Sequence, residues 1–460
     1  MGRIFGTDGV RGIANTELSC KLAMNVARAA AMVVAHCAHH RPTFLIGRDT
    51  RISSPMLEAA IASGLCSVGA NVVLLGVVPT PAVAYLIKEM KVDAGIMISA
   101  SHNPYEFNGI KIFSGDGTKL SDEQEFAIEE IVLDKVMPYA LKCNEEIGTI
   151  RLDHSAVDRY IDHLVSTIDV DLRGIKILVD CSNGSASCTA AKLFAKLGAE
   201  ATFVADTPNG MNINNNCGST NIKGLVQKVK DGRYMLGVAF DGDADRCLAV
   251  DELGNVIDGD RMIAIFAKGL KQKGKLVNNK VVVTVMSNIG FFKFAKDNDI
   301  LVEITKVGDR YVLENMLRTG NCIGGEQSGH VIFFKYMPTG DGQLSAIQLA
   351  AIMKEQNKPL SELAEIMEVY PQVIINVRAD RNMKQHWETD EVVQMVMEKH
   401  SKYLGESGRI LVRASGTEPL IRVMVEGEDE QKIAEIAQNI ADTIKERLSY
   451  NEDCKQMEEF

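Results

Sequence analysis

The segment Ala94-Gly-Ile-Met-Ile-Ser-Ala-Ser-His-Asn-Pro104 joins an apolar run to a sharp polar turn. The apolar run predicts a strand buried in a sheet. Pro104 fixes its own φ and disfavours helix at Asn103, so we expect Ser101 and His102 in a rigid loop at the carboxyl end of that strand. Ligands usually bind at this edge of α/β sheets. The same residues are also common turn formers, so the loop alone leaves its function open.

Strand and helix patterns alternate on both sides of this segment. The alternation recurs in two further stretches, and each ends in a polar loop, which indicates three similar α/β domains with mixed, largely parallel sheets. After residue 368 the pattern changes to three strands and two longer helices, typical of a smaller C-terminal α+β domain. The predicted domains are residues 1–150, 151–254, 255–368 and 369–460.

Composition limits the classes of protein that fit this sequence. The chain has 460 residues and a formal net charge of −11, which argues against nucleic acid as a partner. It contains no apolar run long enough to span a membrane and no signal peptide, so we expect a cytoplasmic protein without a membrane partner. Its ten cysteines form no CxxC pair, which argues against a disulfide framework or structural zinc.

The segment Asp241-Gly-Asp-Ala-Asp-Arg246 places three carboxylates at alternate positions. Neighbouring anions repel one another unless a cation lies among them, and oxygen ligands without His or Cys favour Mg²⁺. A calcium EF-hand does not fit, because Arg246 stands where that loop needs glycine and strands flank the segment. A solvated acidic loop is the alternative.

Two further loops carry polar side chains. Gly324-Gly-Glu-Gln-Ser-Gly-His330 offers groups suited to several hydroxyls of a polar ligand, although a bulge with exposed polar residues has the same pattern. Arg413-Ala-Ser-Gly-Thr-Glu-Pro419, followed by Arg422, places backbone N–H groups, hydroxyls and guanidinium groups where phosphate could bind. Taken alone, this second segment could equally be a hairpin with surface arginines. The stretch 269–276 resembles a P-loop but lacks the hydroxyl that binds Mg²⁺.

Together, SASHNP, DGDADR, GGEQSGH and RASGTEP, in that order and one per domain, resemble the α-D-phosphohexomutase superfamily. The resemblance implies four domains around one central cleft. Three features resemble the branch that acts on glucosamine phosphates: FGTDGVRG at residues 5–12, VGDRY at residues 307–311 and the glutamine of GGEQSGH. The phosphomannomutase and phosphoglucomutase branch is the alternative, and a phosphosugar-binding regulator without turnover is a more distant one.

The resemblance also implies roles for individual residues. Ser101 would carry a phosphate and, with Asp241, Asp243 and Asp245, hold Mg²⁺. His102 would shape the serine loop and contact the phosphate, while Lys111 and His330 are candidates for proton transfer. The residues expected to line the reacting phosphate are Arg11 and Arg246; those expected to bind the substrate are Gly308, Asp309, Glu326 and Ser328, and those expected to hold its other phosphate are Arg413, Ser415, Gly416, Thr417 and Arg422.

The implied reaction interconverts glucosamine 6-phosphate and glucosamine 1-phosphate through phosphoserine and a 1,6-bisphosphate. A phosphoserine carries about −1.5 to −2 charge, so it could lie beside three carboxylates only with compensating cations. Glucosamine 1,6-bisphosphate or glucose 1,6-bisphosphate would serve as activator, and a homodimer is compatible with the sequence. His102 beside Ser101 also suits a hydrolase. The acidic cluster favours a stored phosphate over an acyl group.

Overall fold

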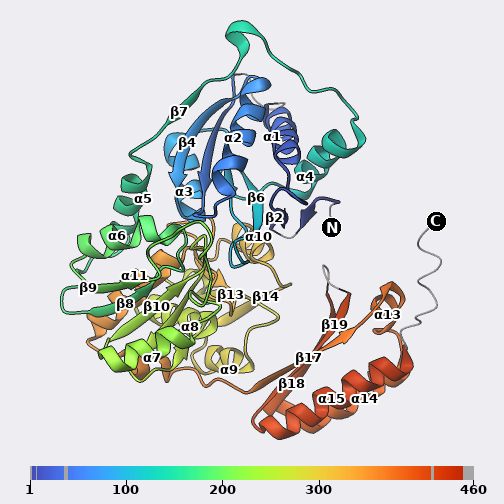
Figure 1. Ribbon diagram of the computed structural model, residues 1–460. Helices are drawn as coiled ribbons and strands as arrows, with labels where there is room; N and C mark the ends of the chain where they lie inside the picture. The colour runs from blue at the N-terminus through green and yellow to red at the C-terminus, as the bar shows by residue number, and fades with distance from the viewer. Residues whose placement is uncertain (1–2, 7, 36–39, 416–418, 449–460) are drawn as a thin grey trace. The chain divides into compact units, whose positions relative to one another are not determined.

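The computed structural model describes residues 3–6, 8–35, 40–415 and 419–448 (Figure 1). The chain divides into two compact units. The first contains Met1–Ser287 and Ala295–Ile366, and the second contains Asn288–Phe294 and Met367–Phe460. Among the described residues, no helix is both long and apolar enough to cross a membrane. The cysteines in the described parts of the chain have free thiols.

The first sheet has seven strands in the order β1-β2-β6-β5-β3-β4-β7. Its strands are β1 (Phe5–Gly6), β2 (Gly9–Ile13), β3 (Thr43–Arg48), β4 (Asn71–Val77), β5 (Ala94–Ile98), β6 (Phe107–Ser114) and β7 (Ile150–Leu152). The helices of this part are α1 (Cys20–Ala35), α2 (Ser54–Ser67), α3 (Thr80–Met90), α4 (Asp122–Glu129), η1 (Glu130–Asp134) and η2 (Asn144–Glu146). Strand β7 lies across the predicted boundary between residues 150 and 151.

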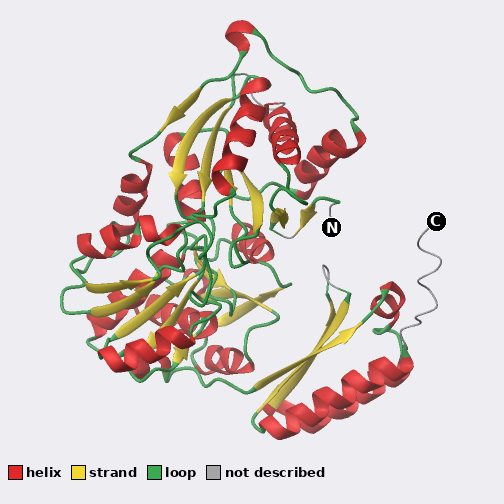
Figure 2. Cartoon of the chain, in the orientation of Figure 1, coloured by secondary structure: helices red, strands yellow, loops and turns green. Residues whose placement is uncertain are grey.

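Helices cover both faces of this sheet (Figure 2). On one face, Ile96 and Ile98 of β5 share a buried core with residues of α1 and α2. On the other face, Gly95 leaves room for Ile87 and Val83 of α3, because a Cβ at Gly95 would come within 2.9 Å of both side chains. All five residues of β5 are therefore buried, as the apolar run in the sequence predicts.

The second and third sheets have the orders β12-β11-β10-β8-β9 and β14-β13-β15-β16. The strands of the second are β8 (Lys176–Asp180), β9 (Glu200–Val204), β10 (Leu236–Phe240), β11 (Cys247–Asp251) and β12 (Val256–Ile257), with helices α5 (Ala156–Val165), η3 (Ser185–Cys188), α6 (Ala190–Lys196) and α7 (Lys223–Gly232). The strands of the third are β13 (Lys280–Thr284), β14 (Leu301–Thr305), β15 (Ile323–Gly325) and β16 (Val331–Phe333). The helices in this part of the sequence are α8 (Gly259–Gln272), η4 (Val277–Asn279), α9 (Ile289–Asp297), α10 (Asp309–Thr319), α11 (Gly342–Gln356) and α12 (Leu360–Ala364).

One four-strand arrangement is common to the three sheets. The four strands, in chain order, are β3–β6 in the first sheet, β8–β11 in the second and β13–β16 in the third. In each set, the first strand pairs in parallel with the second and third, and the third pairs antiparallel with the fourth. The third strand therefore always ends in a loop that returns to its own sheet. The pairs that close these loops are Ile98 with Ile110, Phe240 with Cys247, and Gly325 with Val331. The three similar α/β domains expected from the sequence are confirmed by this repetition.

The second unit is built on a smaller antiparallel sheet in the order β17-β19-β18. Its elements are β17 (Gln372–Arg378), α13 (Arg381–His386), α14 (Glu391–Leu404), η5 (Gly405–Ser407), β18 (Gly408–Ala414), β19 (Leu420–Gly427) and α15 (Glu430–Arg447). Apolar residues of α15, including Ile433, Ile436 and Ile440, are buried in one core with Val423 and Val425 of β19. The predicted α+β character of the C-terminal part is confirmed.

Candidate functional site

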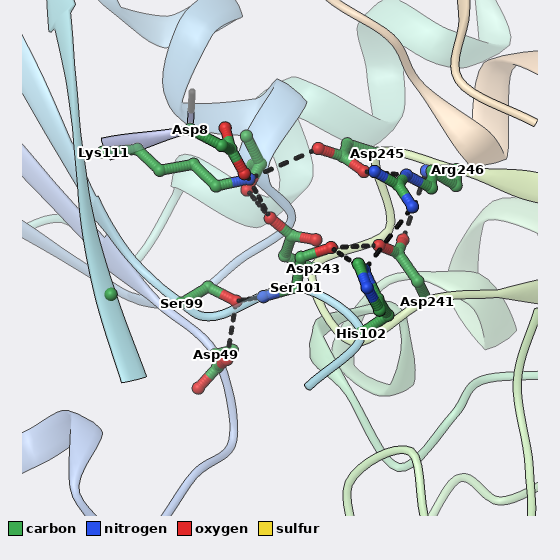
Figure 3. A network of polar contacts seen from close by, with 12 residues as sticks. Asp8, Asp49, Ser99, Ser101, His102, Lys111, Asp241, Asp243, Asp245 and Arg246 are labelled. Atoms are coloured by element: carbon green, nitrogen blue, oxygen red, sulfur yellow. Dashed lines mark hydrogen bonds and ion pairs between the residues drawn. The ribbon is translucent and has the colours of Figure 1, made fainter. Parts of the chain in front are cut away.

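Ser101 lies in the loop between β5 and β6, and its side chain points at the acidic loop of the second sheet (Figure 3). Its Oγ donates a hydrogen bond of 2.7 Å to Oδ2 of Asp241, and the residue is 1% exposed. Ser101 has a φ of 51°, in the left-handed region that residues other than glycine rarely adopt. Its backbone N–H donates to Oγ of Ser99 over 2.9 Å. The loop thus holds a strained serine with its hydroxyl against a carboxylate.

The acidic loop between β10 and β11 gathers three buried carboxylates. Asp241, Asp243 and Asp245 each offer an oxygen, and these oxygens lie within 4.8 Å of one another. Oδ1 of Asp243 and Oδ1 of Asp245 are buried without a hydrogen-bond partner among the described residues. Burial and the two neighbouring carboxylates raise the pKa of Asp241. Two orphaned anionic oxygens and a third carboxylate fit a hard divalent cation, which accepts oxygen ligands at this density.

The acidic loop is fixed by hydrogen bonds from three helices of the first unit, α3, η3 and α11. Thr80, at the start of α3, donates its Oγ1 to Oδ2 of Asp243 over 2.6 Å and its N–H to the carbonyl of Asp243 over 2.9 Å. The N–H of Ser185 donates to the carbonyl of Gly242 over 2.8 Å, and that of Gly342 to Ala244 over 3.0 Å. The position of the carboxylates therefore depends on three domains at once.

Lys111, on β6, supplies the cation nearest to these carboxylates. Its Nζ lies 2.8 Å from Asp243, 3.0 Å from Asp8 and 3.4 Å from Asp245. Burial alone would lower the pKa of Lys111, but the carboxylates outweigh burial and raise the pKa well above its usual value. Lys111 is 1% exposed and is therefore a buried ammonium at neutral pH.

A second lysine, Lys119, connects the first and third sheets. Its Nζ contacts Asp8 over 2.7 Å and Asp309 over 2.6 Å, and Asp309 begins α10. Arg11 also pairs with Asp8. A cavity of about 390 Å³ lies beside this bridge and is lined in part by Lys119, Asp309 and Arg310. The predicted residues Arg11 and Asp309 thus belong to one charged network with Lys111.

His330 closes the loop between β15 and β16 and is surrounded by acids. Its Nδ1 lies 3.8 Å from Asp245 and its Nε2 3.6 Å from Asp309, which are ion-pair distances rather than hydrogen bonds. Burial alone would lower the pKa of His330, but nearby carboxylates raise it above its usual value. The N–H of Gly340 donates to Nε2 over 3.0 Å, so that nitrogen accepts a hydrogen bond. In the same loop, burial raises the pKa of Glu326.

Four more of the predicted residues contact one another in pairs: Glu326 with Gly308, and Arg246 with His102. Oε1 of Glu326 accepts the N–H of Gly308 over 3.0 Å. Nη1 of Arg246 lies 3.4 Å from Nδ1 of His102, and its backbone N–H donates to Oδ1 of Asp241 over 3.2 Å. Burial, and then the positive charges of Arg246 and Arg11, lower the pKa of His102 to about 4. His102 is therefore neutral at pH 7.

The remaining predicted residues lie in the loop between β15 and β16 and in the second unit. Ser328 is exposed, at the tip of the third loop. In the second unit, Arg413 and Arg422 lie opposite each other on β18 and β19, and burial with the charge of Arg422 lowers the pKa of Arg413. Ser415 is 4% exposed at the end of β18. Gly416 and Thr417 lie outside the described residues. Two facing guanidinium groups suit an anion.

Models of four protein domains match the chain in order. They are described as the phosphoglucomutase/phosphomannomutase α/β/α domains I, II and III, at residues 2–137, 158–254 and 258–370, and the C-terminal domain of the same family, at residues 374–443. Two curated relatives are named phosphoglucosamine mutase. The one from Caldicellulosiruptor bescii is 51% identical over 453 residues, and the one from Caldanaerobacter subterraneus is 52% identical over 451. Each alignment covers 98% of this chain and 100% of the relative.

The chain belongs to the phosphoglucosamine mutase family.

A solved structure supports the same fold. A phosphoglucomutase/phosphomannomutase family protein from Burkholderia thailandensis superposes with a TM-score of 0.82 at 24% identity, covering 97% of this chain and 98% of that one. The N-acetylphosphoglucosamine mutase of Aspergillus fumigatus, solved with GlcNAc-6P and magnesium, has a TM-score of 0.67 at 16% identity, covering 97% and 96%. At these identities the likeness concerns the fold.

Sequence reasoning missed several residues that this member of the phosphoglucosamine mutase family places around the site. Asp8 and Lys119 belong to the charged network, and Thr80 holds Asp243. Arg51 and Asn214 contact the serine loop through its carbonyl groups. A usable signal was Asp49-Thr-Arg51, because it directly follows β3 at the strand edge that carries the other loops.

Proposed function

We propose that this protein interconverts glucosamine 6-phosphate and glucosamine 1-phosphate through a phosphate carried on Ser101. The observation that carries the proposal is the contact of 2.7 Å between Oγ of Ser101 and Asp241 within a cluster of three buried carboxylates. The names of the curated relatives support the glucosamine substrate. The fungal mutase solved with GlcNAc-6P and magnesium supports a phosphorylated amino sugar and that metal.

In this proposal, Asp241, Asp243 and Asp245 hold Mg²⁺. Bound there, the metal would neutralise negative charge on the phosphate and on the carboxylates. Lys111 adds a fixed positive charge from the other side of Asp243, over 2.8 Å. Phosphoryl transfer depends mainly on positioning and charge neutralisation, and these groups provide both.

The transfer itself requires Oγ of Ser101 and a sugar hydroxyl to exchange one phosphoryl group. Phospho-Ser101 gives its phosphoryl group to O1 of glucosamine 6-phosphate, and the serine later takes back the group from O6 of the resulting 1,6-bisphosphate. A base must accept the proton of the attacking hydroxyl. Lys111 and His330 are the two candidates for this base, and nearby carboxylates raise the pKa of both. Arg11 and Arg246 would contact the moving phosphate.

Substrate binding is assigned to the third loop and to the second unit. Gly308, Asp309, Glu326 and Ser328 would bind the sugar hydroxyls, and the hydrogen bond from Gly308 to Glu326 supports a shared site. Arg413, Ser415, Gly416, Thr417 and Arg422 would bind the phosphate that does not react. We also infer four domains, with the boundaries predicted from the sequence adjusted so that β7 stays with the first sheet and β12 with the second.

The decisive experiment compares glucosamine, mannose and glucose 6-phosphates as substrates of the purified protein, with Mg²⁺ and a trace of glucose 1,6-bisphosphate as activator. Turnover of glucosamine 6-phosphate at least about tenfold above the other two, equivalent to about 1.4 kcal/mol, supports the substrate assignment. Equal or faster turnover of mannose 6-phosphate would favour a phosphomannomutase instead. After incubation with glucose 1,6-bisphosphate, peptide mass spectrometry should show one phosphate on Ser101, and a protein that turns over substrate without acquiring this phosphate would refute the mechanism.

A further inference from the structure

The carbonyl groups of Ser101, Asn103 and Pro104 in the serine loop accept hydrogen bonds from two side chains in other parts of the fold. Nη2 of Arg51 donates to the carbonyls of Ser101 and Asn103 over 2.9 and 2.8 Å, and Nη1 donates to Pro104. Nδ2 of Asn214 donates to the same carbonyls of Ser101 and Asn103, each over 2.9 Å. Two donors therefore converge on the backbone of the residue that carries the reactive hydroxyl.

Each of these two side chains is itself held in place. Arg51 is fully buried, and its Nε donates to Oδ2 of Asp49 over 2.8 Å. The same carboxylate oxygen accepts the hydroxyl of Ser99, whose Oγ accepts the N–H of Ser101. Asp49 thus holds the loop through Arg51 on one side and through Ser99 on the other.

Asn214 comes from the connection between β9 and α7 of the second sheet. Its Oδ1 accepts the hydroxyl of Ser182 over 2.7 Å, and its N–H donates to the carbonyl of Ser182 over 2.9 Å. The side chain of Asn214 is thus oriented with its amide nitrogen toward the serine loop. One flank of the loop is otherwise open, because a cavity of about 300 Å³ is lined by His102, Pro104 and Asn214 among others.

We propose that Asn214 and Arg51 are positioning residues that keep Ser101 in its left-handed conformation, with Oγ directed at Asp241. A non-glycine residue at a φ of 51° is stable only when its surroundings fix it, and these are the side chains that bind its carbonyl. Ser101 lies in a loop of the first sheet, whereas Asn214 and the three carboxylates lie in loops of the second sheet. The second sheet's loops therefore supply both the carboxylates and part of the support for Ser101. This inference rests on the proposed function of Ser101.

The test compares Asn214→Gly with Asn216→Gly. Both asparagines have a positive φ, 58° and 54°, which glycine adopts without strain, and both lose an amide side chain. Only Asn214 contacts the serine loop, because the amide of Asn216 is exposed and contacts Asn215 and Asn221. We expect Asn214→Gly to lower kcat about tenfold with KM for the sugar phosphate changed less than about threefold, and Asn216→Gly to change kcat less than about twofold.

Two measurements separate this proposal from the proposed function. The first is the rate at which glucose 1,6-bisphosphate phosphorylates Ser101, followed by intact mass, which should fall about tenfold in Asn214→Gly alone. The second is hydrogen exchange of the backbone at residues 100–104, which requires no activity and should be faster in Asn214→Gly than in Asn216→Gly. Equal exchange in the two variants would overturn the positioning role. If the unsubstituted protein has no mutase activity but exchange is still faster in Asn214→Gly, the positioning role stands and the proposed function is overturned instead.

Arg51→Lys, compared with Arg48→Lys, extends the test to the second donor. Lysine keeps the charge opposite Asp49 but lacks the planar fork that reaches several carbonyls. Arg48 is the last residue of β3, three residues before Arg51, and its side chain pairs with Glu58 over 3.2 Å. We expect faster exchange at residues 100–104 in Arg51→Lys only. If Arg48→Lys has the same effect, the role of Arg51 is general packing.

Discussion

The serine loop and the acidic loop occupy the same place in two equivalent sheets, yet they are held in different ways. Each follows a fully buried strand, β5 or β10, and each contains a non-glycine residue with a positive φ, Ser101 at 51° or Ala244 at 56°. The serine loop is bound at its carbonyl oxygens by the side chains of Arg51 and Asn214. The acidic loop is bound largely by backbone N–H groups, at Gly242, Asp243 and Ala244.

This difference follows from the charge that each loop carries. In the proposed function the carboxylates of the acidic loop face a cation, and the backbone N–H groups that hold this loop add no formal charge beside them. The donors of the serine loop bind the carbonyl of Ser101 rather than its hydroxyl, which in the proposed function is the group that carries the phosphate. One scaffold thus serves two chemical tasks, because the loop and its supports change while the four strands do not.

The largest expected effect comes from removing the reactive group of the serine loop. Ser101→Ala should lose at least about 10⁴-fold in turnover, because no other group can carry the phosphate. A coupled assay of the product measures the loss of turnover, and the intact mass after incubation with sugar bisphosphate measures the loss of phosphate. Ser99→Ala is the matched control, since it removes a neighbouring hydroxyl that contacts Asp49 and the N–H of Ser101 rather than Asp241, and it should retain measurable turnover. Comparable losses in the two variants would mean that Ser101 is not the phosphate carrier.

The next effect concerns the acidic loop. Asp243→Asn should lower Mg²⁺-dependent turnover about 10³-fold, because it removes a carboxylate with an orphaned buried oxygen and a partner of Lys111. Mg²⁺ titration by calorimetry and circular dichroism distinguish loss of metal binding from loss of fold. An unchanged Mg²⁺ affinity would contradict the metal assignment.

A smaller effect tests the support of the acidic loop from the first sheet. Thr80→Val keeps the shape of the side chain but removes the hydroxyl that donates to Asp243 over 2.6 Å. We expect Mg²⁺ affinity and turnover to fall about tenfold, the usual range for groups that orient a metal ligand. Thr80→Ser retains the hydroxyl and should stay near the original activity; if it loses as much as Thr80→Val, packing rather than the hydrogen bond is responsible.

The last prediction concerns stability rather than turnover, at Asp341, which accepts the N–H of Leu344 at the start of α11, the helix whose Gly342 binds Ala244. Burial raises its pKa to about 7 from 3.8. The folded state therefore binds the proton of Asp341 more tightly than the unfolded state does. The contribution of this group to the free energy of unfolding is full below about pH 4 and decreases as the pH rises to about 7. Asn at position 341 cannot titrate. The stability of the original protein relative to Asp341→Asn should fall by up to about 1.4 kcal/mol per pH unit between about pH 5 and 7, measured by chemical unfolding. A constant difference would contradict the raised pKa.

Features that are contiguous in the sequence were predictable. The apolar run that forms β5, the three carboxylates at alternate positions and the recurring alternation of strands and helices follow from local pattern, and the structure confirms them. The resemblance to phosphohexomutases was carried by such contiguous segments, and the family membership confirms it.

Features that depend on long-range burial were not predicted. All residues of helix α11 from Gly342 to Met353 except Gln348 are buried, so its sequence lacks the apolar stripe that identifies a helix at a protein surface. Strand β6 begins Phe107-Asn-Gly, which is typical of a turn, and only its antiparallel pairing with β5 makes it a strand. Arg51 and Asn214 lie 50 and 113 residues from Ser101 along the chain and meet it through backbone carbonyls. Backbone acceptors are present at every position, so no residue pattern marks them as partners.

The dependence of the serine loop on Asn214 has a consequence for how the chain is made. Synthesis proceeds from the N-terminus, and domains generally fold as units in that order, so the first sheet can form before Asn214 and the acidic loop exist. At that stage Ser101 has one of its two carbonyl supports and none of the three carboxylates. If Ser101 carries the phosphate as proposed, a partly made chain has the hydroxyl but lacks Asn214 and the acidic loop. Competence to accept phosphate is then a property of the completed assembly of sheets.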